Sequence, residues 1–194
     1  MDKRFEKTDI KLKEAFLKEI VENDFDSISI KLICARANVN RITYYQHYKD
    51  KYDLLDSIFC DMDREALTNL PTRNKLNNPD NNPYKTVSNY LYYFVEALNK
   101  RINLVIAIAS HKAGYIYFSF ENFFKIRFKT MLINSGVTKQ LKYSLEQTIS
   151  FITGGVINFI VSGVELNKYT NFESIFTDAQ SLFINLIRSE LIYK

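Results

Sequence analysis

The chain has 194 residues, of which 46% are hydrophobic and 25% charged; this is the balance of an ordinary folded protein and argues against a disordered chain or a membrane protein. The formal net charge of +4 permits binding to nucleic acid but does not establish it. The first seven residues are mostly charged and lead into no apolar run, so they do not form a secretory signal, and we expect a cytoplasmic location. The two cysteines, Cys34 and Cys60, fit a reduced protein better than a disulfide scaffold, and we expect both to be buried thiols.

The first predicted element is a helix in which Leu12, Ala15, Phe16 and Ile20 recur at helical spacing. After it, residues 29–47 predict two short helices joined by a tight turn. Ser29 and Asn40 are N-cap residues for these helices, and Asn38 between them tolerates the left-handed backbone conformation that a turn needs.

The second of these short helices is rich in hydroxyl, amide and cationic side chains. Two short helices with such a second member are typical of a helix-turn-helix, whose recognition helix fits the major groove of DNA. The pair Asp50 and Asp53 is then predicted to cap a further helix, from about residue 50 to residue 70, that belongs to both halves of the chain.

The segment 71–83 holds all three prolines and many asparagines, and it predicts a loop. Beyond it we expect helices at about 90–98, at about 120–135 with Gly136 as the C-cap, at 138–162, and from about 171 to 192. No charged residue lies between Glu146 and Glu165, a stretch close to the minimum of about 18 residues for a membrane span. Its polar and small residues favour a helix buried within protein, so we expect no membrane partner.

The sequence therefore predicts an all-α protein. A three-helix helix-turn-helix domain over residues 1–52 precedes a larger helical bundle over residues 53–194. The helices at 138–162 and 171–192 are apolar on more than one face, and we expect them to form a homodimer.

The segment from Ser29 to Leu55 resembles the TetR/AcrR family of transcriptional regulators, and the match is carried by the motif Val-Asn-Arg-x-Thr-Tyr-Tyr-x-His-Tyr-Lys-Asp-Lys. Phe151-x-x-Gly154-Gly155 resembles the C-terminal domain of one branch of that family. The resemblance implies a regulator of transcription that binds palindromic double-stranded DNA as a homodimer, most often a repressor released by a small-molecule effector. It implies no cofactor.

The resemblance also implies roles for single residues. Contacts to DNA phosphates fall to Ser29, Thr43, Tyr45, His47 and Lys51, and contacts to base edges to Arg41, Ile42 and Tyr44. The chemistry agrees, because hydroxyl and cationic groups fix a protein on the backbone, and an arginine makes a bidentate contact to guanine.

Alternative interpretations stay open for several of these residues. Tyr44 and Tyr45 can pack on the domain's own core, and His47 can be a local capping residue. Ile42 can contact a thymine methyl group or hold the helix farther from the bases.

Aromatic residues are abundant in the second half of the chain, and the candidates for an effector pocket are Tyr93, His111, Tyr115 and Phe124. An aromatic stripe at helical spacing is as typical of a core. A protein partner in place of a small molecule is the other hypothesis for this domain.

Enzymatic motifs are absent: the sequence has no Gly-x-Ser-x-Gly, no phosphate-cradling glycine loop and no His-Glu-x-x-His. Its two histidines, His47 and His111, lie in different predicted domains, so we expect no metal site. We expect a DNA-binding regulator and not an enzyme.

Overall fold

The computed structural model describes residues 3–110 and 114–167, together with positions 174, 178, 181, 182, 185 and 186. The described residues form helices joined by short turns and contain no β-strand. In chain order the elements are α1 (Lys3–Glu22), η1 (Phe25–Ser27), α2 (Ile30–Ala37), α3 (Arg41–His47), α4 (Lys51–Asn77), α5 (Pro83–Asn99), α6 (Ile102–Ser110), α7 (Tyr115–Ser135), η2 (Val137–Gln140) and α8 (Leu145–Asn167). The prediction of an all-α fold is confirmed.

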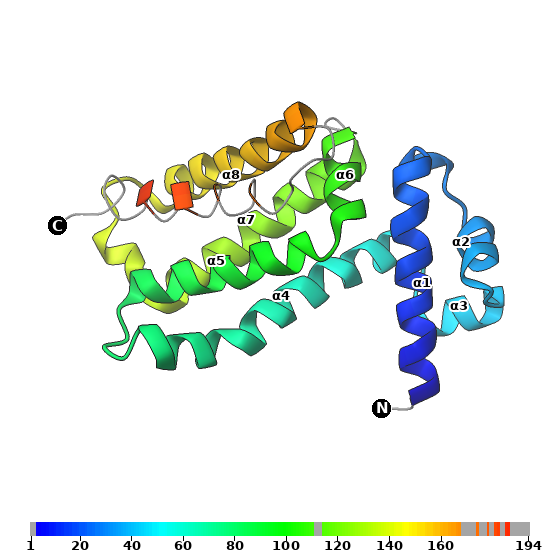
Figure 1. The fold of residues 1–194 in the computed structure, drawn as a ribbon, viewed down its shortest axis with the longest axis horizontal. Coiled ribbons are helices and arrows are strands. Elements are labelled where there is room, and N and C mark those ends of the chain that lie inside the picture. The colour runs from blue at the N-terminus through cyan, green and yellow to red at the C-terminus, as the bar shows by residue number, and fades with distance from the viewer. Residues whose placement is uncertain are drawn as a thin grey trace.

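Helices α1, α2 and α3 form a group at one end of the molecule, and α4 leads from them into a bundle of α4 to α8 (Figure 1). The predicted apolar face of α1 is the core of this group, because Leu12, Phe16 and Ile20 are fully buried. Helix α4 passes through the predicted boundary after residue 52 without a break. The division into 1–52 and 53–194 therefore remains a prediction.

The predicted loop over residues 71–83 is wrong, since α4 continues to Asn77 with Pro71 inside it. A proline within a helix removes one backbone donor, which here would serve the carbonyl of Leu67 on an exposed stretch. The last turns are held by side-chain amides: Nε of Arg73 donates to Oδ1 of Asn89 on α5 at 3.1 Å, and Asn77 and Asn89 exchange two hydrogen bonds. Only residues 78–82 form the turn.

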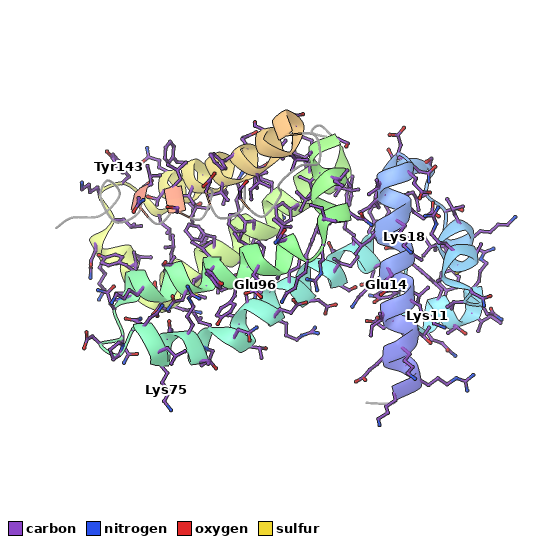
Figure 2. The ribbon with its side chains drawn as sticks, in the orientation of Figure 1. Lys11, Glu14, Lys18, Lys75, Glu96 and Tyr143 are labelled. Carbon is purple, nitrogen blue, oxygen red and sulfur yellow. The ribbon has the colours of Figure 1, made fainter. Side chains whose placement is uncertain are left out.

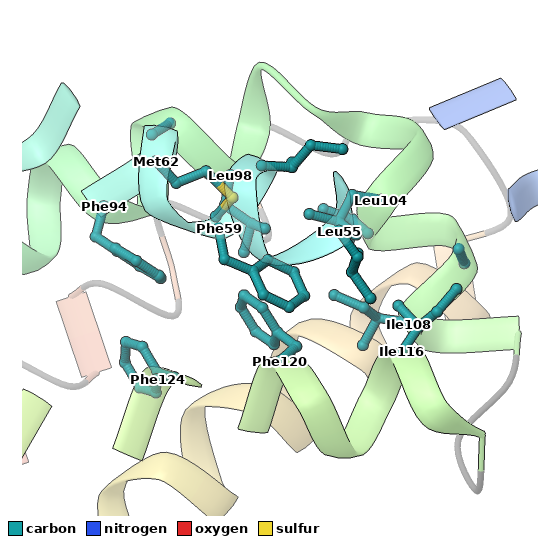
Figure 3. Close-up of a cluster of buried hydrophobic side chains, with 14 of the residues drawn as sticks. Leu55, Phe59, Met62, Phe94, Leu98, Leu104, Ile108, Ile116, Phe120 and Phe124 are labelled. Carbon is teal, nitrogen blue, oxygen red and sulfur yellow. The ribbon is translucent and has the colours of Figure 1, made fainter. Parts of the chain in front are cut away.

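The bundle core is aromatic where α4, α5 and α7 meet, and α6 covers it with Leu104 and Ile108 (Figure 3). Ring centroids lie 5.6 Å apart for Phe59 and Phe120, and 5.2 Å apart for Phe94 and Phe124. These helices also share a buried polar contact: the hydroxyl of Tyr90 donates to Oδ1 of Asp63 at 2.7 Å, and Arg127 pairs with the other oxygen of that carboxylate.

Helix α8 begins at Leu145 and not near residue 138, because Ser144 and Gln147 form a capping box. Its buried residues pack against α6 and α7. Among the described helices it alone is long and apolar enough to cross a membrane, which is weak support for a span because core helices meet the same criterion. The predicted C-cap at Gly136 is confirmed by its left-handed backbone (φ 77°). Most of the predicted last helix, 171–192, lies outside the described residues.

Candidate DNA-binding site

The turn between α2 and α3 has the geometry that the sequence predicts. Oγ of Ser29 accepts a hydrogen bond from the backbone amide of Leu32 at 3.2 Å, and Oδ1 of Asn40 accepts from that of Ile42 at 2.7 Å. Asn38 adopts the left-handed conformation (φ 51°, ψ 50°). Asp50 caps α4 by accepting from the amides of Tyr52 and Asp53. These bonds set two short helices at a tight corner, with one side of α3 facing outward.

The outward side of α3 is formed by Arg41, Ile42, Tyr45 and Gln46, all of which are exposed. Ile42 is 71% exposed, which is unusual for a large apolar side chain on a folded protein. Gln46 follows Ile42 by one helical turn and therefore lies beside it. Gln46 was not among the predicted contacts; its helical spacing from Ile42 is the signal that points to it.

The resemblance implied that Tyr44 contacts base edges, but its side chain points into the protein. Its side chain is completely buried, and its hydroxyl donates to the carbonyl oxygen of Asp50 at 2.9 Å. Burial raises the pKa of Tyr44 above its usual value. The residue anchors α3 to the start of α4, so the core-packing alternative is correct for Tyr44 and wrong for Tyr45, which is 52% exposed.

Only 2% of the side chain of His47 is exposed, and its contact with a DNA phosphate stays a prediction. Its ring stacks on that of Phe5 in α1, with the centroids 3.7 Å apart. Burial lowers the pKa of His47 below that of a free imidazole, which favours the neutral form. Its Nδ1 has no hydrogen-bond partner among the described residues and lies 3.8 Å from Oδ1 of Asp9.

Lys51 forms hydrogen bonds within the chain, and its contact with DNA stays a prediction. Its ammonium group donates to the carbonyl oxygens of Phe25, Asp26 and Ile28 at 2.6, 3.2 and 3.1 Å, and these three bonds use all its protons. Nζ also lies 4.6 Å from the ring centroid of Phe25. Burial lowers the pKa of Lys51. The residue holds the turn that precedes α2.

The other predicted phosphate contacts, Ser29, Thr43 and Tyr45, keep hydroxyl groups at or near the surface, and their contact with DNA stays a prediction. Thr43 lines a recess of about 450 Å³ between α3 and the first turns of α1. Arg4 and Lys11 of α1 and Asn38, Asn40 and Gln46 of the helix-turn-helix line the same recess.

The predicted effector residues do not share one environment. Phe124 is buried in the core against Phe94, and Tyr93 contacts Tyr92 and the guanidinium of Arg73. Tyr115 contacts Phe25 in the turn before α2 and Tyr52 at the start of α4. His111 lies outside the described residues. Phe124 is thus a core residue and Tyr115 a junction residue, and neither is placed as a pocket lining.

The two cysteines differ from each other. Cys34 is buried as expected, whereas Cys60 is exposed, so the expectation of two buried thiols is wrong for Cys60. It sits on the outer side of α4, in a groove between α4 and α1. Burial nevertheless raises the pKa of both thiols, which keeps them protonated near neutral pH. Among the residues that the structure describes, no cluster of histidine, cysteine or carboxylate side chains could hold a metal ion.

No family model matches the chain, and no curated protein matches its sequence. Several solved structures share its fold. A protein described as a TetR-family transcriptional regulator, from Syntrophomonas wolfei, is 17% identical and has a TM-score of 0.71, with 97% of this chain and 99% of that chain covered. The fatty acid degradation regulator FadR from Bacillus halodurans is 11% identical with a TM-score of 0.66, covering 93% of this chain and 96% of its own. The dihydroxyacetone kinase operon activator DhaS is 21% identical with a TM-score of 0.54 and the same coverage.

The chain therefore has the fold of the TetR-family transcriptional regulators, over nearly its whole length. The resemblance predicted from the motif between Ser29 and Leu55 is confirmed at this level. These matching proteins are described as regulators of transcription.

Proposed function

From this fold and the surface of α3, we propose that the chain is a sequence-specific, DNA-binding regulator of transcription in the cytoplasm. The observation that carries the proposal is the outward side of α3, where an exposed arginine, isoleucine, tyrosine and glutamine stand on a short helix held by Asn40 and Tyr44. An exposed mixture of amide, cation and apolar side chain suits base edges in the major groove.

Arg41, Ile42 and Gln46 are the base-reading residues in this proposal. Arginine pairs with the O6 and N7 atoms of guanine, glutamine with the N6 and N7 atoms of adenine, and an apolar side chain with the methyl group of thymine. Because Ile42 and Gln46 lie one turn apart on the same side, we expect each half-site to contain A·T pairs beside a G·C pair. The hydroxyl groups of Ser29, Thr43 and Tyr45 serve as phosphate contacts.

The regulator acts as a homodimer on a palindromic operator. Support comes from α8, whose residues Phe151 and Phe159 are 60% and 36% exposed and flank Gly155 on one side of the helix. A second copy of the same helix would cover these rings and leave two recognition helices to fill two half-sites.

Regulation is proposed to come from an effector bound by α4 to α8 that changes the spacing of the recognition helices, releasing a repressor from DNA. Support comes from the packing of α6 on α1 and of Tyr115 on Phe25, through which the bundle contacts the DNA-binding group. By linkage, an effector that weakens DNA binding must bind less tightly to the DNA-bound chain, by the same factor. Equal effector affinities with and without operator, measured by calorimetry, would contradict this part.

The experiment for the whole proposal is selection of bound duplexes from a randomised pool by the full-length chain, followed by sequencing. We expect an inverted repeat with half-sites about one helical turn apart, ~34–36 Å or a multiple of it. A matched selection with Gln46→Ala should lose the preference at one position of each half-site. No enrichment of any duplex by the wild-type chain would contradict the proposal.

A further inference from the structure

The recess between α1 and α3 has a composition that fits an anion. Its volume is about 450 Å³, and two cationic side chains from α1, Arg4 and Lys11, face hydroxyl and amide groups of the helix-turn-helix across it. No carboxylate is among the described residues that line it. Lys11 is exposed, and no ion pair of Lys11 occurs in the described part of the chain.

The adjoining groove between α1 and α4 shows the opposite character. Its lining includes six carboxylates, from Glu6, Asp9, Asp53, Asp56, Asp61 and Glu65. The described lining of the recess is thus cationic without a carboxylate, whereas the groove holds six carboxylates and two cationic side chains, Lys13 and Arg64. This asymmetry favours an anion in the recess on the α3 side and disfavours one in the other groove.

The two walls of the recess are held in place by a contact between two aromatic rings. His47 lines the recess although only 2% of its side chain is exposed, so the imidazole lies at its base, stacked on Phe5. That stack joins the first turns of α1 to the end of α3 and fixes the distance between the two walls. Because burial lowers the pKa of His47, the positive charge of the recess comes from Arg4 and Lys11.

The position of the recess relative to the base-reading side of α3 indicates which anion would bind there. Ile42 and Gln46 lie near the middle of the outward side, Tyr45 lies on one flank, and Thr43 lies on the other flank, where it lines the recess. A helix in the major groove has a phosphate backbone on each side of it. Tyr45 is then directed to one strand, and the recess is directed to the other.

We propose that this recess holds a backbone phosphate of the DNA strand on the α1 side of the major groove, with Lys11 and Arg4 as its cationic ligands and Thr43 as a hydroxyl ligand. The inference rests on the proposed function and adds α1 to the DNA-binding surface. It adds Lys11 and Arg4 to the phosphate contacts that the resemblance implied. The recess thereby fixes how far α3 enters the groove.

The test compares Lys11→Ala with Lys18→Ala in the full-length chain, using a fluorescein-labelled duplex taken from the selection described above. Both lysines are exposed on α1 (Figure 2), and Lys18 lies two turns farther along, ~10 Å away, outside the recess. Fluorescence anisotropy over a range of KCl concentrations gives the slope of log K against log [KCl]. In the proposed dimer Lys11→Ala removes one phosphate contact from each half-site, so it should lower the magnitude of that slope by about 1.8 and weaken binding roughly 50-fold near 0.1 M salt. Lys18→Ala should change both quantities much less.

Duplexes with a single neutral methylphosphonate linkage locate the phosphate. For the wild-type chain, a methylphosphonate at one particular linkage per half-site should lower the affinity. The Lys11→Ala chain should show no further loss at that linkage, and the Lys18→Ala chain should behave like the wild type. Equal slopes and equal methylphosphonate sensitivity for the two variants would overturn the inference and leave the proposed function intact. Absence of any selected duplex would instead refute the proposed function, and this inference with it.

Discussion

The ring of Tyr115, at the start of α7, lies almost parallel to the ring of Phe25, in the turn before α2, with centroids 4.9 Å apart and an interplanar angle of 15°. Tyr52 at the start of α4 meets the same tyrosine edge-on at 4.8 Å. Lys51 binds the carbonyl of Phe25 and lies over its ring. The turn that positions α2 is therefore held by the bundle as well as by the DNA-binding group.

This contact predicts a measurable coupling between Tyr115 and Phe25. In a double-mutant cycle with Tyr115→Ala and Phe25→Leu, the two changes in the free energy of unfolding should fail to add by about 0.5–1.5 kcal/mol, the usual range for an aromatic pair. Urea unfolding followed by circular dichroism measures each corner of the cycle. Tyr115→Phe is the control, since it keeps the stack. Additive effects would show that the stack does not couple the two parts.

Base reading by α3 predicts specific losses. Arg41→Ala and Gln46→Ala should each reduce the preference for the cognate site over a mismatched site by ~1–3 kcal/mol, at different base pairs. Tyr44→Phe should instead leave the preference unchanged and lower stability, because its hydroxyl is bound to Asp50 inside the protein. Competition titrations at one fixed salt concentration separate these outcomes. An unchanged preference in Gln46→Ala would remove it from the base-reading group.

The three hydrogen bonds of Lys51 predict a loss of stability when this residue is replaced. Lys51→Met should lower the free energy of unfolding by about 1–3 kcal/mol, because three carbonyl oxygens lose their donor and two of these bonds are partly buried. The slope of log K against log [KCl] should stay close to that of Lys49→Met, an exposed neighbour that carries the same charge. A lowered slope with unchanged stability would instead identify Lys51 as a phosphate ligand.

The lowered pKa of His47 predicts that the stability of the chain depends on pH. Because burial lowers its pKa in the folded chain, the unfolded chain binds more protons, and stability must rise with pH through this interval. The free energy of unfolding should thus fall as pH drops through about 6.5, the pKa of a free imidazole. Asp9 favours the charged ring and Lys13 opposes it, so the decline is moderated but not reversed. His47→Gln should flatten the curve, and a curve left unchanged by this substitution would contradict the assignment to His47.

The exposed side of α8 predicts how the dimer is broken. A Cβ added at Gly155 meets no atom of the described residues within 4 Å, so Gly155→Glu should leave the fold intact and place a charge between the two copies of the proposed dimer. Sedimentation should then give a monomer, with DNA binding weakened accordingly. Ser150→Glu, exposed on another side of α8, should remain dimeric. A dimeric Gly155→Glu chain would place the interface elsewhere.

Capping and turn residues could be predicted because their signals are local. Ser29, Asn40 and Asp50 each bond to backbone amides two or three residues away, so the sequence contains both partners at fixed spacing. Gly136 likewise depends only on its own backbone conformation. These residues define where helices begin and end, and through them the helix-turn-helix.

The contacts that His47, Lys51 and Tyr44 make within the chain could not be predicted, because their partners are brought close by folding. His47 meets Phe5 across two helices, and Lys51 meets the turn at Phe25, 26 residues earlier in the chain. The continuation of α4 past Pro71 could not be predicted for the same reason. Arg73 and Asn77 form side-chain hydrogen bonds with Asn89 of α5, and these contacts outweigh the local cost of a proline. A family motif names positions that recur, but each side chain's environment decides what it contacts.

The unbroken course of α4 past Pro71 makes it a long lever. Its 27 residues correspond to a rod of about 40 Å, one end at the recognition helix and the other in the amide contacts with α5. A rotation of about 5° about the far end displaces the near end by roughly 3.5 Å, which equals the rise of one base pair of DNA. A tilt of this small angle would therefore shift α3 by a whole base-pair step, and in the proposed dimer a palindrome of fixed spacing would no longer fit both copies.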